Sequence, residues 1–566
     1  MSSPAASTQP VARRLDEWFE LPGWEPAPPA PAGEIGACAV LGDTRSARAL
    51  AARLCEMGCP TLHLECAPGA AEGHDRALAW IRERPEAARR IVAAWAADPP
   101  GPAGMDALLE RALHPVLGLG RAAASSGDRR PVQIDVLTAG AYDVDGTERA
   151  NPALATVLGP TRVLPLELPH LHVRHLDLGA EPHAGGGSLA AVVAELAAAP
   201  APPVVALRGR VRWLPSLRPV ELPAAAGERA WRPGGSYLVT GGLGGFGQAL
   251  AEHLARTARA RLALVARTPL PPRERWDTAG VEPGAAAAIA AIRRVEALGG
   301  EVALYAEDVT DAAGMRRVRD DLLRRFGRLD GIVHAAGVPG AGLVEARRRA
   351  DGERVLAPKV AGTLVLSEVF GGLPLDFIVL CSSLTSFVGG VGQADYCAAN
   401  AFLDAFPSSG LPLADRAVAV NWGGLLGAGM WVPREGDVGM EPAHAMEALR
   451  RAIGARVGPR VVILPVPVLE ARPWVPGTGR AGPAGPMPRT ADELERRLAG
   501  LWSEALEAEV PTNGNFFELG GNSLLAVELL WRMADELGVR LPMHLLTEAA
   551  TPAAVARAIL ARTGGA

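Results

Sequence analysis

Four polar residues in the second half of the chain have the types and spacing for acid–base chemistry on a carbonyl group. Ser383 and Tyr396 are thirteen positions apart, and Asn400 follows the tyrosine by four. A phenol is a poor acid near neutral pH unless a neighbouring cation and hydrogen-bond donors stabilise its phenolate. Lys359 would supply the cation and Ser383 would orient a carbonyl, so that Tyr396 donates the proton. This chemistry requires a hydride donor.

A glycine-rich run upstream offers a place for a dinucleotide donor. It follows a predicted strand at Tyr237–Val239 and opens a predicted helix at Gln248–Thr257. Glycines there permit a tight turn that brings backbone N–H groups to a diphosphate at a helix N-terminus. An ordinary glycine-rich connection is the alternative, because such a run alone is weak evidence. The candidate cofactor residues of the run are Thr240, Gly241, Gly242, Leu243, Gly244, Gly245, Phe246 and Gly247.

Residues after the next two predicted strands are candidates for cofactor binding, and the first of them favours NADPH over NADH. Arg267 ends the strand at Leu262–Val265, where an NAD-specific site would place an acid on the ribose 2′-hydroxyl. An arginine suits a 2′-phosphate, although a solvated surface arginine is the alternative. Asp308 and Val309 close the following strand, where the carboxylate could accept a hydrogen bond from adenine. Helix capping is nearly as good an interpretation of Asp308, because a helix begins near Thr310.

Small residues end the predicted strand that follows. His334 precedes Ala335, Ala336 and Gly337, which leave room for the nicotinamide ribose. His334 itself is interpreted as a packed structural histidine and not as a catalyst.

The size and composition of the chain limit the possible functions. At 566 residues, three or four domains are expected. The net charge is −5 with no basic stripe, which argues against nucleic acid as a partner. The N-terminus lacks the order of a signal peptide, and no apolar run is long enough for a bilayer. The six scattered cysteines are expected to be buried free thiols, with no metal site, in a soluble cytoplasmic protein.

The order of apolar runs predicts two α/β units followed by a helical one. After a tail at 1–15, residues 16–231 and 232–470 each alternate short strands with helices, which is typical of a parallel sheet. The first unit has a turn after Leu41 without spaced glycines, so we expect a structural role without a nucleotide. Residues 471–488 are a Pro/Gly/Ala-rich linker, and 489–564 form a compact helical domain.

The motifs together resemble the short-chain dehydrogenase/reductase superfamily, and within it the ketoreductase domain of modular polyketide synthases. Most superfamily members have a lysine four residues after the tyrosine, whereas this chain has Asn400 there and its lysine upstream. Further resemblance lies in the stretches 206–213, 358–362, 377–383, 392–404 and 421–423. The resemblance covers about residues 16–470 and implies two Rossmann-like, doubly wound subdomains, one structural and one catalytic.

The resemblance also implies the role of each residue. Tyr396 would protonate the ketone oxygen as hydride arrives from NADPH, and Lys359 would lower the pKa of the tyrosine. Ser383 would bond to the same oxygen, and Asn400 would hold the lysine and an ordered water. Ketoreductases with this tetrad reduce a β-ketoacyl thioester to the β-hydroxyacyl thioester.

Two markers of product configuration in that family are absent. Val338-Pro-Gly-Ala341 stands where many ketoreductases that give the D-hydroxy product have Leu-Asp-Asp. Val388 stands where those giving the L-product often have tryptophan. The configuration is therefore open, with a slight preference for the L-type. Residues 425–439 are expected to form a lid over the substrate.

The C-terminal domain resembles an acyl or peptidyl carrier. In Asn515-Phe-Phe-Glu-Leu-Gly-Gly-Asn-Ser-Leu-Leu525, Ser523 lies at the start of an amphipathic helix and would carry 4′-phosphopantetheine. A helix-capping serine is the alternative. The flanking helices fit an all-α four-helix carrier bundle. Asn522 replaces the aspartate commoner in acyl carriers, which leaves the preferred partner enzymes open.

We therefore expect a ketoreductase–carrier didomain from a polyketide or mixed polyketide–peptide assembly line. Because no condensing or acyl-selecting domain is recognisable, it would be a fragment, or a small protein of the assembly line, that works with other synthase domains and a phosphopantetheinyl transferase. One alternative is a carrier and scaffold protein with a catalytically silent reductase half. Another is a free-standing alcohol dehydrogenase, which the fused carrier disfavours.

Overall fold

The computed structural model describes most of the chain between residues 13 and 563. The residues outside this description are 1–12, 32, 85–88, 100–103, 181–186, 199–201, 278–282, 341, 429–437, 469–489, 507–508, 517–518, 520–528, 530–532, 534–536, 538–549 and 564–566.

The first half of the fold is a parallel sheet with helices on both faces. Its strands are β2 (Ala37–Leu41), β3 (Thr61–Leu64), β4 (Arg89–Ala96), β5 (Val132–Ala139), β6 (Leu171–Leu178) and β7 (Val204–Arg208), in the order β3-β2-β4-β5-β6-β7. Apolar residues of α1 (Arg45–Glu56) and α6 (Gly187–Ala197) cover one face. The other face packs against α2 (Ala71–Arg82), α3 (Met105–Ser125) and α5 (Leu158–Glu167). Both faces are covered, which explains the nearly continuous apolar runs of β2 and β4.

The second half repeats this architecture with a different strand order. Its parallel strands are β9 (Ser236–Thr240), β10 (Arg261–Ala266), β11 (Glu301–Ala306), β12 (Gly331–His334), β13 (Phe377–Ser383), β14 (Ala417–Trp422) and β15 (Arg460–Ile463), in the order β11-β10-β9-β12-β13-β14-β15. One face packs against α7 (Gly245–Ala258), α8 (Pro283–Ala297) and α13 (Pro442–Ala455). The other carries α9 (Ala312–Phe326), α10 (Arg349–Phe370) and α12 (Ala394–Ala405). This is the order of a dinucleotide-binding sheet, whose ligands bind at the carboxyl ends of the strands.

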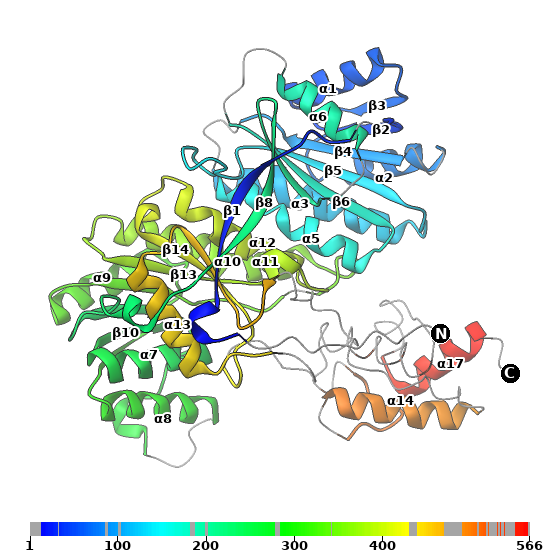
Figure 1. Cartoon of the computed structure of the whole chain (residues 1–566). Helices are drawn as coiled ribbons and strands as arrows, with labels where there is room; N and C mark the ends of the chain where they lie inside the picture. The colour runs from blue at the N-terminus through cyan, green and yellow to red at the C-terminus, as the bar shows by residue number, and fades with distance from the viewer. Residues whose placement is uncertain are drawn as a thin grey trace, which may run out of the picture.

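An antiparallel ribbon joins the two halves (Figure 1). It consists of β1 (Phe19–Ala27) and β8 (Val211–Val220), which pair with each other, while β1 also pairs with β15 and β8 with β7. The strands within the described residues therefore form a single sheet of fifteen. The prediction of two Rossmann-like units is confirmed, but the continuous sheet and the strands β1 and β15 were not predicted. Hydrophobic periodicity indicates where a strand lies and does not specify which strand it pairs with.

Helix α5 of the first half packs closely on α12 of the second. A Cβ added at Gly159 would lie only 2.3 Å from the Ala394 carbonyl oxygen and 2.8 Å from the Ala398 Cβ. The same hydrophobic core contains Val163 and Leu164 of α5 and Phe402 of α12. The helix that carries Tyr396 and Asn400 is therefore supported by the other subdomain.

The short elements connect these layers. They are α4 (Pro152–Ala155), α11 (Thr385–Val388) and the 3₁₀ turns at Leu15–Glu17, Ala224–Gly227, Arg273–Arg275, Phe406–Ser408 and Ala414–Arg416.

The C-terminal unit is described in part. Helix α14 (Ala491–Leu506) and helix α17 (Pro552–Thr563) lie together, apart from the large sheet in Figure 1. Helix α14 has a buried stripe formed by Leu494, Leu498 and Trp502. The rings of Trp502 and Phe516 meet edge-on, with 5.3 Å between their centres. Leu529, Met533 and Leu537, spaced four apart, are also buried in this core. The spacing is that of one helix face.

Two composition-based expectations can be compared with the described residues. All six cysteines are unpaired, but only Cys38, Cys381 and Cys397 are buried, while Cys55 is exposed. No described helix combines the length and apolar character that crossing a bilayer demands.

Candidate active site

Tyr396, Ser383 and Lys359 come from three elements that meet at the carboxyl edge of the sheet. Ser383 is the last residue of β13, Tyr396 lies in the first turn of α12, and Lys359 lies in the middle of α10. The Lys359 amine lies 5.7 Å from the centre of the Tyr396 ring. The structure thus brings together the predicted acid, its cation and the serine.

Burial and hydrogen bonding act on Tyr396 in opposite directions. Burial raises the pKa of the Tyr396 phenol, and hydrogen bonding to the side chains of Ser383 and Asn400 lowers it. Burial dominates, so the phenol holds its proton near neutral pH. Ser383 Oγ also shares a 2.5 Å hydrogen bond with Thr385 Oγ1 and accepts one from the Thr385 N–H at 3.2 Å. The serine hydroxyl is therefore oriented by the turn that follows it.

Lys359 is a buried cation held by a backbone carbonyl. The residue is 3% exposed, and Nζ donates to the Cys381 carbonyl oxygen at 2.6 Å. Burial lowers the pKa of Lys359 to about 8. The amine therefore carries its proton at neutral pH and loses it slightly above.

Asn400 has an amide oxygen without a partner. Its Nδ2 donates to the Tyr396 carbonyl oxygen at 2.7 Å, and its buried Oδ1 accepts nothing within the described part of the chain. A hydrogen bond from Asn400 to Lys359, which the resemblance implies, is not present among the described residues. A buried polar atom without a partner is a place for an ordered water or a substrate group.

A polar network behind Asn400 was not predicted from the sequence. Asn421 Nδ2 donates to Asp404 Oδ1 at 2.8 Å and to Ser382 Oγ at 3.1 Å. Arg460 Nη2 donates to Asp404 Oδ2 at 2.6 Å. These bonds fix the carboxyl ends of β13 and β14 to α12. The signal was available, since Asp404 and Asn421 lie inside the stretches that carry the family resemblance.

The glycine turn after β9 is shaped by close backbone contacts. Gly241 has φ +68°, and a Cβ there would lie 2.9 Å from the Ala335 carbonyl oxygen. A Cβ at Gly247 would lie 2.6 Å from the Gly241 carbonyl oxygen. Gly244 is the N-cap of α7 and offers no side chain to the first N–H groups of the helix. This open helix start fits a diphosphate.

In the first half, the N–H groups at the start of the corresponding helix, α1, already have hydrogen-bond partners. The Asp98 carboxylate accepts hydrogen bonds from the Arg45 and Ser46 backbone N–H groups, at 2.8 and 3.0 Å. Thr44 Oγ1 accepts the Ala47 N–H at 3.1 Å. A protein carboxylate thus occupies the N–H groups of α1 that a phosphate would need.

His334 connects the two strands beneath the cofactor site. It is fully buried, with Nδ1 2.7 Å from Thr240 Oγ1 and Nε2 3.0 Å from the Pro358 carbonyl oxygen. Burial lowers the pKa of His334 to about 3, so the ring is neutral. The Ala336 N–H donates to Thr240 Oγ1 at 3.3 Å. His334 therefore positions Thr240 and the residues after β12.

The other candidate cofactor residues lie at the same edge. Arg267 follows β10 and is exposed. Asp308 Oδ1 accepts the Thr310 N–H at 2.9 Å and the Thr310 hydroxyl at 2.8 Å, whereas Asp311 is the N-cap of α9. Asp308 thus organises the turn after β11 and does not cap the helix. Val309 is buried, and Ala335, Ala336 and Gly337 are half-buried.

Two expected features fall largely outside the described residues. Ser523 lies there, and so does most of the lid at 425–439. Within the described part of the lid, Leu425 pairs with Met440 and both are buried.

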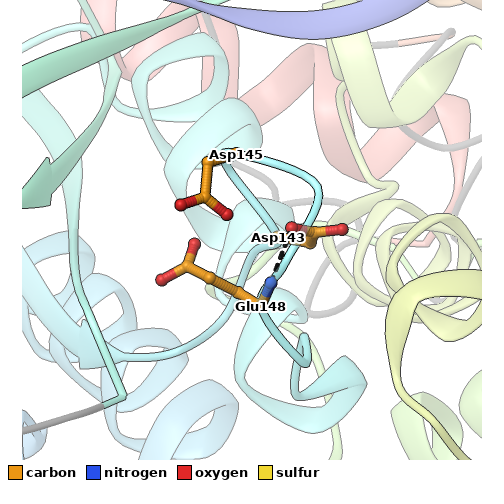
Figure 2. Close-up of side chains that lie close together, drawn as sticks. All are labelled: Asp143, Asp145 and Glu148. Atoms are coloured by element: carbon orange, nitrogen blue, oxygen red, sulfur yellow. Dashed lines mark hydrogen bonds between the residues drawn. The ribbon is translucent and has the colours of Figure 1, made fainter.

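Three carboxylates gather in a turn of the first half (Figure 2). Asp143, Asp145 and Glu148 place oxygen atoms within 4.8 Å of one another. Asp143 Oδ1 accepts the N–H groups of Gly146 and Glu148, and Asp145 Oδ1 accepts the Thr147 N–H. Glu148 Oε1 accepts Arg208 Nε at 2.6 Å. Hydrogen bonds within the turn and the bond from Arg208 therefore explain why the three carboxylates lie together.

The strand order and the open glycine turn after β9 are those of a dinucleotide-binding sheet, and Tyr396, Ser383 and Lys359 meet at the carboxyl ends of its strands. Residues 235–427 match the family model of the KR domain. Residues 496–559 match the model of the phosphopantetheine attachment site. The chain therefore contains a KR domain followed by a carrier-type phosphopantetheine attachment domain; a KR domain implies NADPH, and an attachment domain implies covalent 4′-phosphopantetheine.

Similar proteins are synthases that are longer than this chain. A phenolphthiocerol/phthiocerol polyketide synthase of Mycobacterium tuberculosis is 28% identical over an alignment 585 residues long, gaps included. The alignment covers 96% of this chain and 29% of that protein. A 6-methylsalicylic acid synthase of Arthrobotrys oligospora is 31% identical over 385 residues, covering 61% of this chain and 22% of that protein. The chain thus spans less than a third of the length of these relatives.

Solved ketoreductases share the fold. An A-type ketoreductase from a modular polyketide synthase superposes with a TM-score of 0.65 at 26% identity, covering 80% of this chain and 94% of that one. A C2-type ketoreductase from a modular polyketide synthase has a TM-score of 0.63 at 23% identity, covering 81% and 98%.

Proposed function

We propose that the chain reduces the β-keto group of an acyl thioester within a polyketide or mixed polyketide–peptide assembly line. The observation that carries this proposal is the convergence of Tyr396, Ser383 and Lys359 at the carboxyl edge of a sheet that also carries α7, a helix whose start has no side-chain cap. The reactive oxygen of the substrate would lie between the Tyr396 and Ser383 hydroxyls, with the cofactor against the glycine turn. NADPH bound there supplies the hydride.

The protein residues would control the proton. Ser383 donates a hydrogen bond to the ketone oxygen, and Tyr396 transfers its phenolic proton to that oxygen as negative charge develops. The charged amine of Lys359 stabilises the phenolate that remains. The unpartnered Asn400 Oδ1 holds a water that returns a proton to this site. The products are the β-hydroxyacyl thioester and NADP⁺, and Tyr396 recovers its proton from solvent.

The cofactor would be held by groups at the carboxyl edge of the sheet. The N–H groups at the start of α7 bind the diphosphate, and Arg267 pairs with the 2′-phosphate. Asp308 retains Oδ2 for the adenine amino group. Ala335, Ala336 and Gly337 leave space for the nicotinamide ribose.

The carrier would present the substrate on a phosphopantetheine arm attached to Ser523. Tethering raises the local substrate concentration to roughly millimolar, so weak direct affinity suffices. A phosphopantetheinyl transferase must load the arm, and other synthase domains must build and remove the acyl chain. A cytoplasmic location, these partners and the product configuration remain predictions from the sequence.

One experiment tests the reaction directly. The carrier is loaded at Ser523 with a defined β-ketoacyl arm, NADPH is added, and the product is measured by mass and chirality. We expect a gain of two hydrogens in the wild type and a rate lower by about 10²- to 10⁴-fold in Tyr396→Phe.

A matched control is Tyr305→Phe, which removes a hydroxyl bonded to Asp321 at the edge of the sheet. Unchanged turnover in Tyr396→Phe would remove the mechanism. Absence of NADPH oxidation by the wild type, with both the loaded carrier and trans-decalone, would favour a scaffold role. Equal turnover of small free ketones and tethered ones would instead favour a free-standing dehydrogenase.

A further inference from the structure

Glu167 reaches from the structural half into the catalytic half. It is the last residue of α5, and its two carboxylate oxygens accept hydrogen bonds from two separate segments. Oε2 accepts the Val344 N–H at 2.7 Å, and Oε1 accepts the Gly392 N–H at 2.9 Å. Val344 follows β12, whereas Gly392 lies in the turn before α12. One side chain therefore clamps two backbone segments of the other subdomain.

Both clamped segments connect to the residues just before Tyr396. The turn that contains Gly392 is the connection between Ser383 and Tyr396, so its position helps to set the distance between the two hydroxyls. The Gly342 N–H donates to the Gly392 carbonyl oxygen at 3.1 Å, which ties the segments to each other. A Cβ at Gly340 would lie 2.7 Å from the same oxygen, so the contact is between backbones.

A buried ion pair fixes the far end of the first segment. Arg347 donates to both oxygens of Asp395, the residue before Tyr396, at 2.5 Å each. The side chains are 2% and 1% exposed. A Cβ at Gly352 would lie 2.6 Å from Asp395 Oδ1, so only glycine fits beside the pair. Residues 342–347 are thus attached at two places, to the turn before α12 through Gly392 and to the first turn of α12 through Asp395.

The choice of glutamate at position 167 follows from these contacts. Burial raises the pKa of Glu167 to about 7, while the hydrogen bonds from Val344 and Gly392 lower it. No ion pair within the described residues involves Glu167, so a carboxylate is costly at this position. The carboxylate, however, offers a separate oxygen to each of the two N–H donors. A glutamine would place its own NH₂ group against one of them.

The residues next to the three clamp residues have a common environment. Leu166, Leu343 and Val391 adjoin Glu167, Val344 and Gly392 in the sequence. Val391 belongs to the hydrophobic cluster that contains the carrier core, and Leu166 and Leu343 pack against this cluster. The clamp therefore lies between the carrier-facing surface and Tyr396.

We propose that Glu167 is a positioning residue that holds the segments 342–347 and 389–393 as one wall of the substrate site. The proposal rests on the proposed reductase function. The wall limits how the β-ketoacyl group can approach Tyr396 and Ser383, and so which face of the ketone meets the hydride. The nucleotide-free half of the protein thereby contributes to orienting the substrate.

The test compares Glu167→Gln with the wild type and with Glu221→Gln, a control at an exposed site. Hydrogen–deuterium exchange is measured at the amides of Val344 and Gly392, independently of activity. Steady-state kinetics use a β-ketoacyl pantetheine thioester, and the product configuration is determined by chiral chromatography. Melting temperature and NADPH affinity are measured in parallel.

We expect faster exchange at one or both amides, about a tenfold higher KM and a larger share of the minor product configuration in Glu167→Gln. NADPH affinity and melting temperature should stay close to those of the control. Unchanged exchange, or unchanged KM and configuration, would overturn the positioning role. A parallel loss of NADPH affinity would show general disruption and would also overturn it. If the wild type reduces no thioester, the proposed function fails, while the exchange result still decides whether Glu167 clamps the wall.

Discussion

The amine of Lys359 lies 5.7 Å from the centre of the Tyr396 ring, although the two residues belong to different helices. Lys359 Nζ is anchored on the Cys381 carbonyl oxygen, two residues before Ser383 on β13. One lysine therefore contacts the strand that ends in the serine and lies beside the ring of the acid. Burial in this position removes the ammonium group from water, which lowers its pKa toward neutral pH.

Activity should decline as the pH rises through about 8. Burial lowers the pKa of Lys359 to about 8 from an ordinary value of 10.5, so the amine is charged below this pH and neutral above it. A neutral amine no longer stabilises the phenolate of Tyr396. The pH dependence of kcat, measured at saturating NADPH, should show an inflection near pH 8. The variant Lys359→Met should be slower by about 10²- to 10⁴-fold, and its residual rate should lack that inflection. A wild-type kcat that stays constant up to pH 10 would contradict this role of Lys359.

Arg267→Ala should reduce the preference for NADPH over NADH. The exposed guanidinium follows β10, where it can pair with the 2′-phosphate, and loss of such a pair costs about 1 kcal/mol or more. We expect KM for NADPH to rise about tenfold and KM for NADH to change little. Arg256→Ala, at an exposed position of α7, is the matched control. A proportional change in both KM values would place Arg267 outside the phosphate site.

Ser523→Ala should abolish carrier loading without affecting the reductase. After incubation with coenzyme A and a phosphopantetheinyl transferase, intact-mass spectrometry should show one added phosphopantetheine on the wild type and none on the variant. Ser503→Ala, which removes a hydroxyl that donates to the Ala499 carbonyl oxygen and accepts the Val510 N–H, should still be loaded. Reduction of a free thioester substrate should be the same in all three proteins. Modification of Ser523→Ala would show that another residue is the attachment site.

Gly159→Ala should destabilise the contact between the two halves. Its Cβ would lie 2.3 Å from the Ala394 carbonyl oxygen, so α5 and the helix of Tyr396 must separate. Overpacking of this kind costs about 1–3 kcal/mol, which urea unfolding would measure, and kcat should fall as Tyr396 shifts. Gly284→Ala in α8, where no atom lies within 4 Å of the added Cβ, should be neutral or slightly stabilising. Similar stability of the two variants would mean that the helices adapt freely.

Local sequence patterns predicted most of the catalytic half. The run Phe377–Cys381 became the buried strand β13, Phe377–Ser383, and the glycines after Val239 became the turn before α7. These features depend on residues close in the chain, because buried parallel strands need continuous apolar runs and a tight turn needs glycine. The reductase and carrier assignments, which the comparisons confirm, rest on the same local motifs.

Other features depend on residues far apart in the chain. Phe19 pairs with Ile463 and Val220, which makes one sheet from two predicted units. Glu167, in a run that resembles any apolar helix end, binds the N–H groups of Val344 and Gly392. Neither relationship leaves a periodic or compositional mark near the residue.

The sequence by itself determined which residue types are available for the chemistry: a phenol, a serine hydroxyl, an amine, a glycine run predicted to hold NADPH, and a motif around Ser523 predicted to carry phosphopantetheine. Only the tertiary structure decided which half supports which residue. It placed Lys359 beside Tyr396, filled the start of α1 with Asp98, and set Glu167 against the turn before Tyr396. The physical reason is that side-chain type is a property of one position, whereas distance and burial arise only when remote segments pack together.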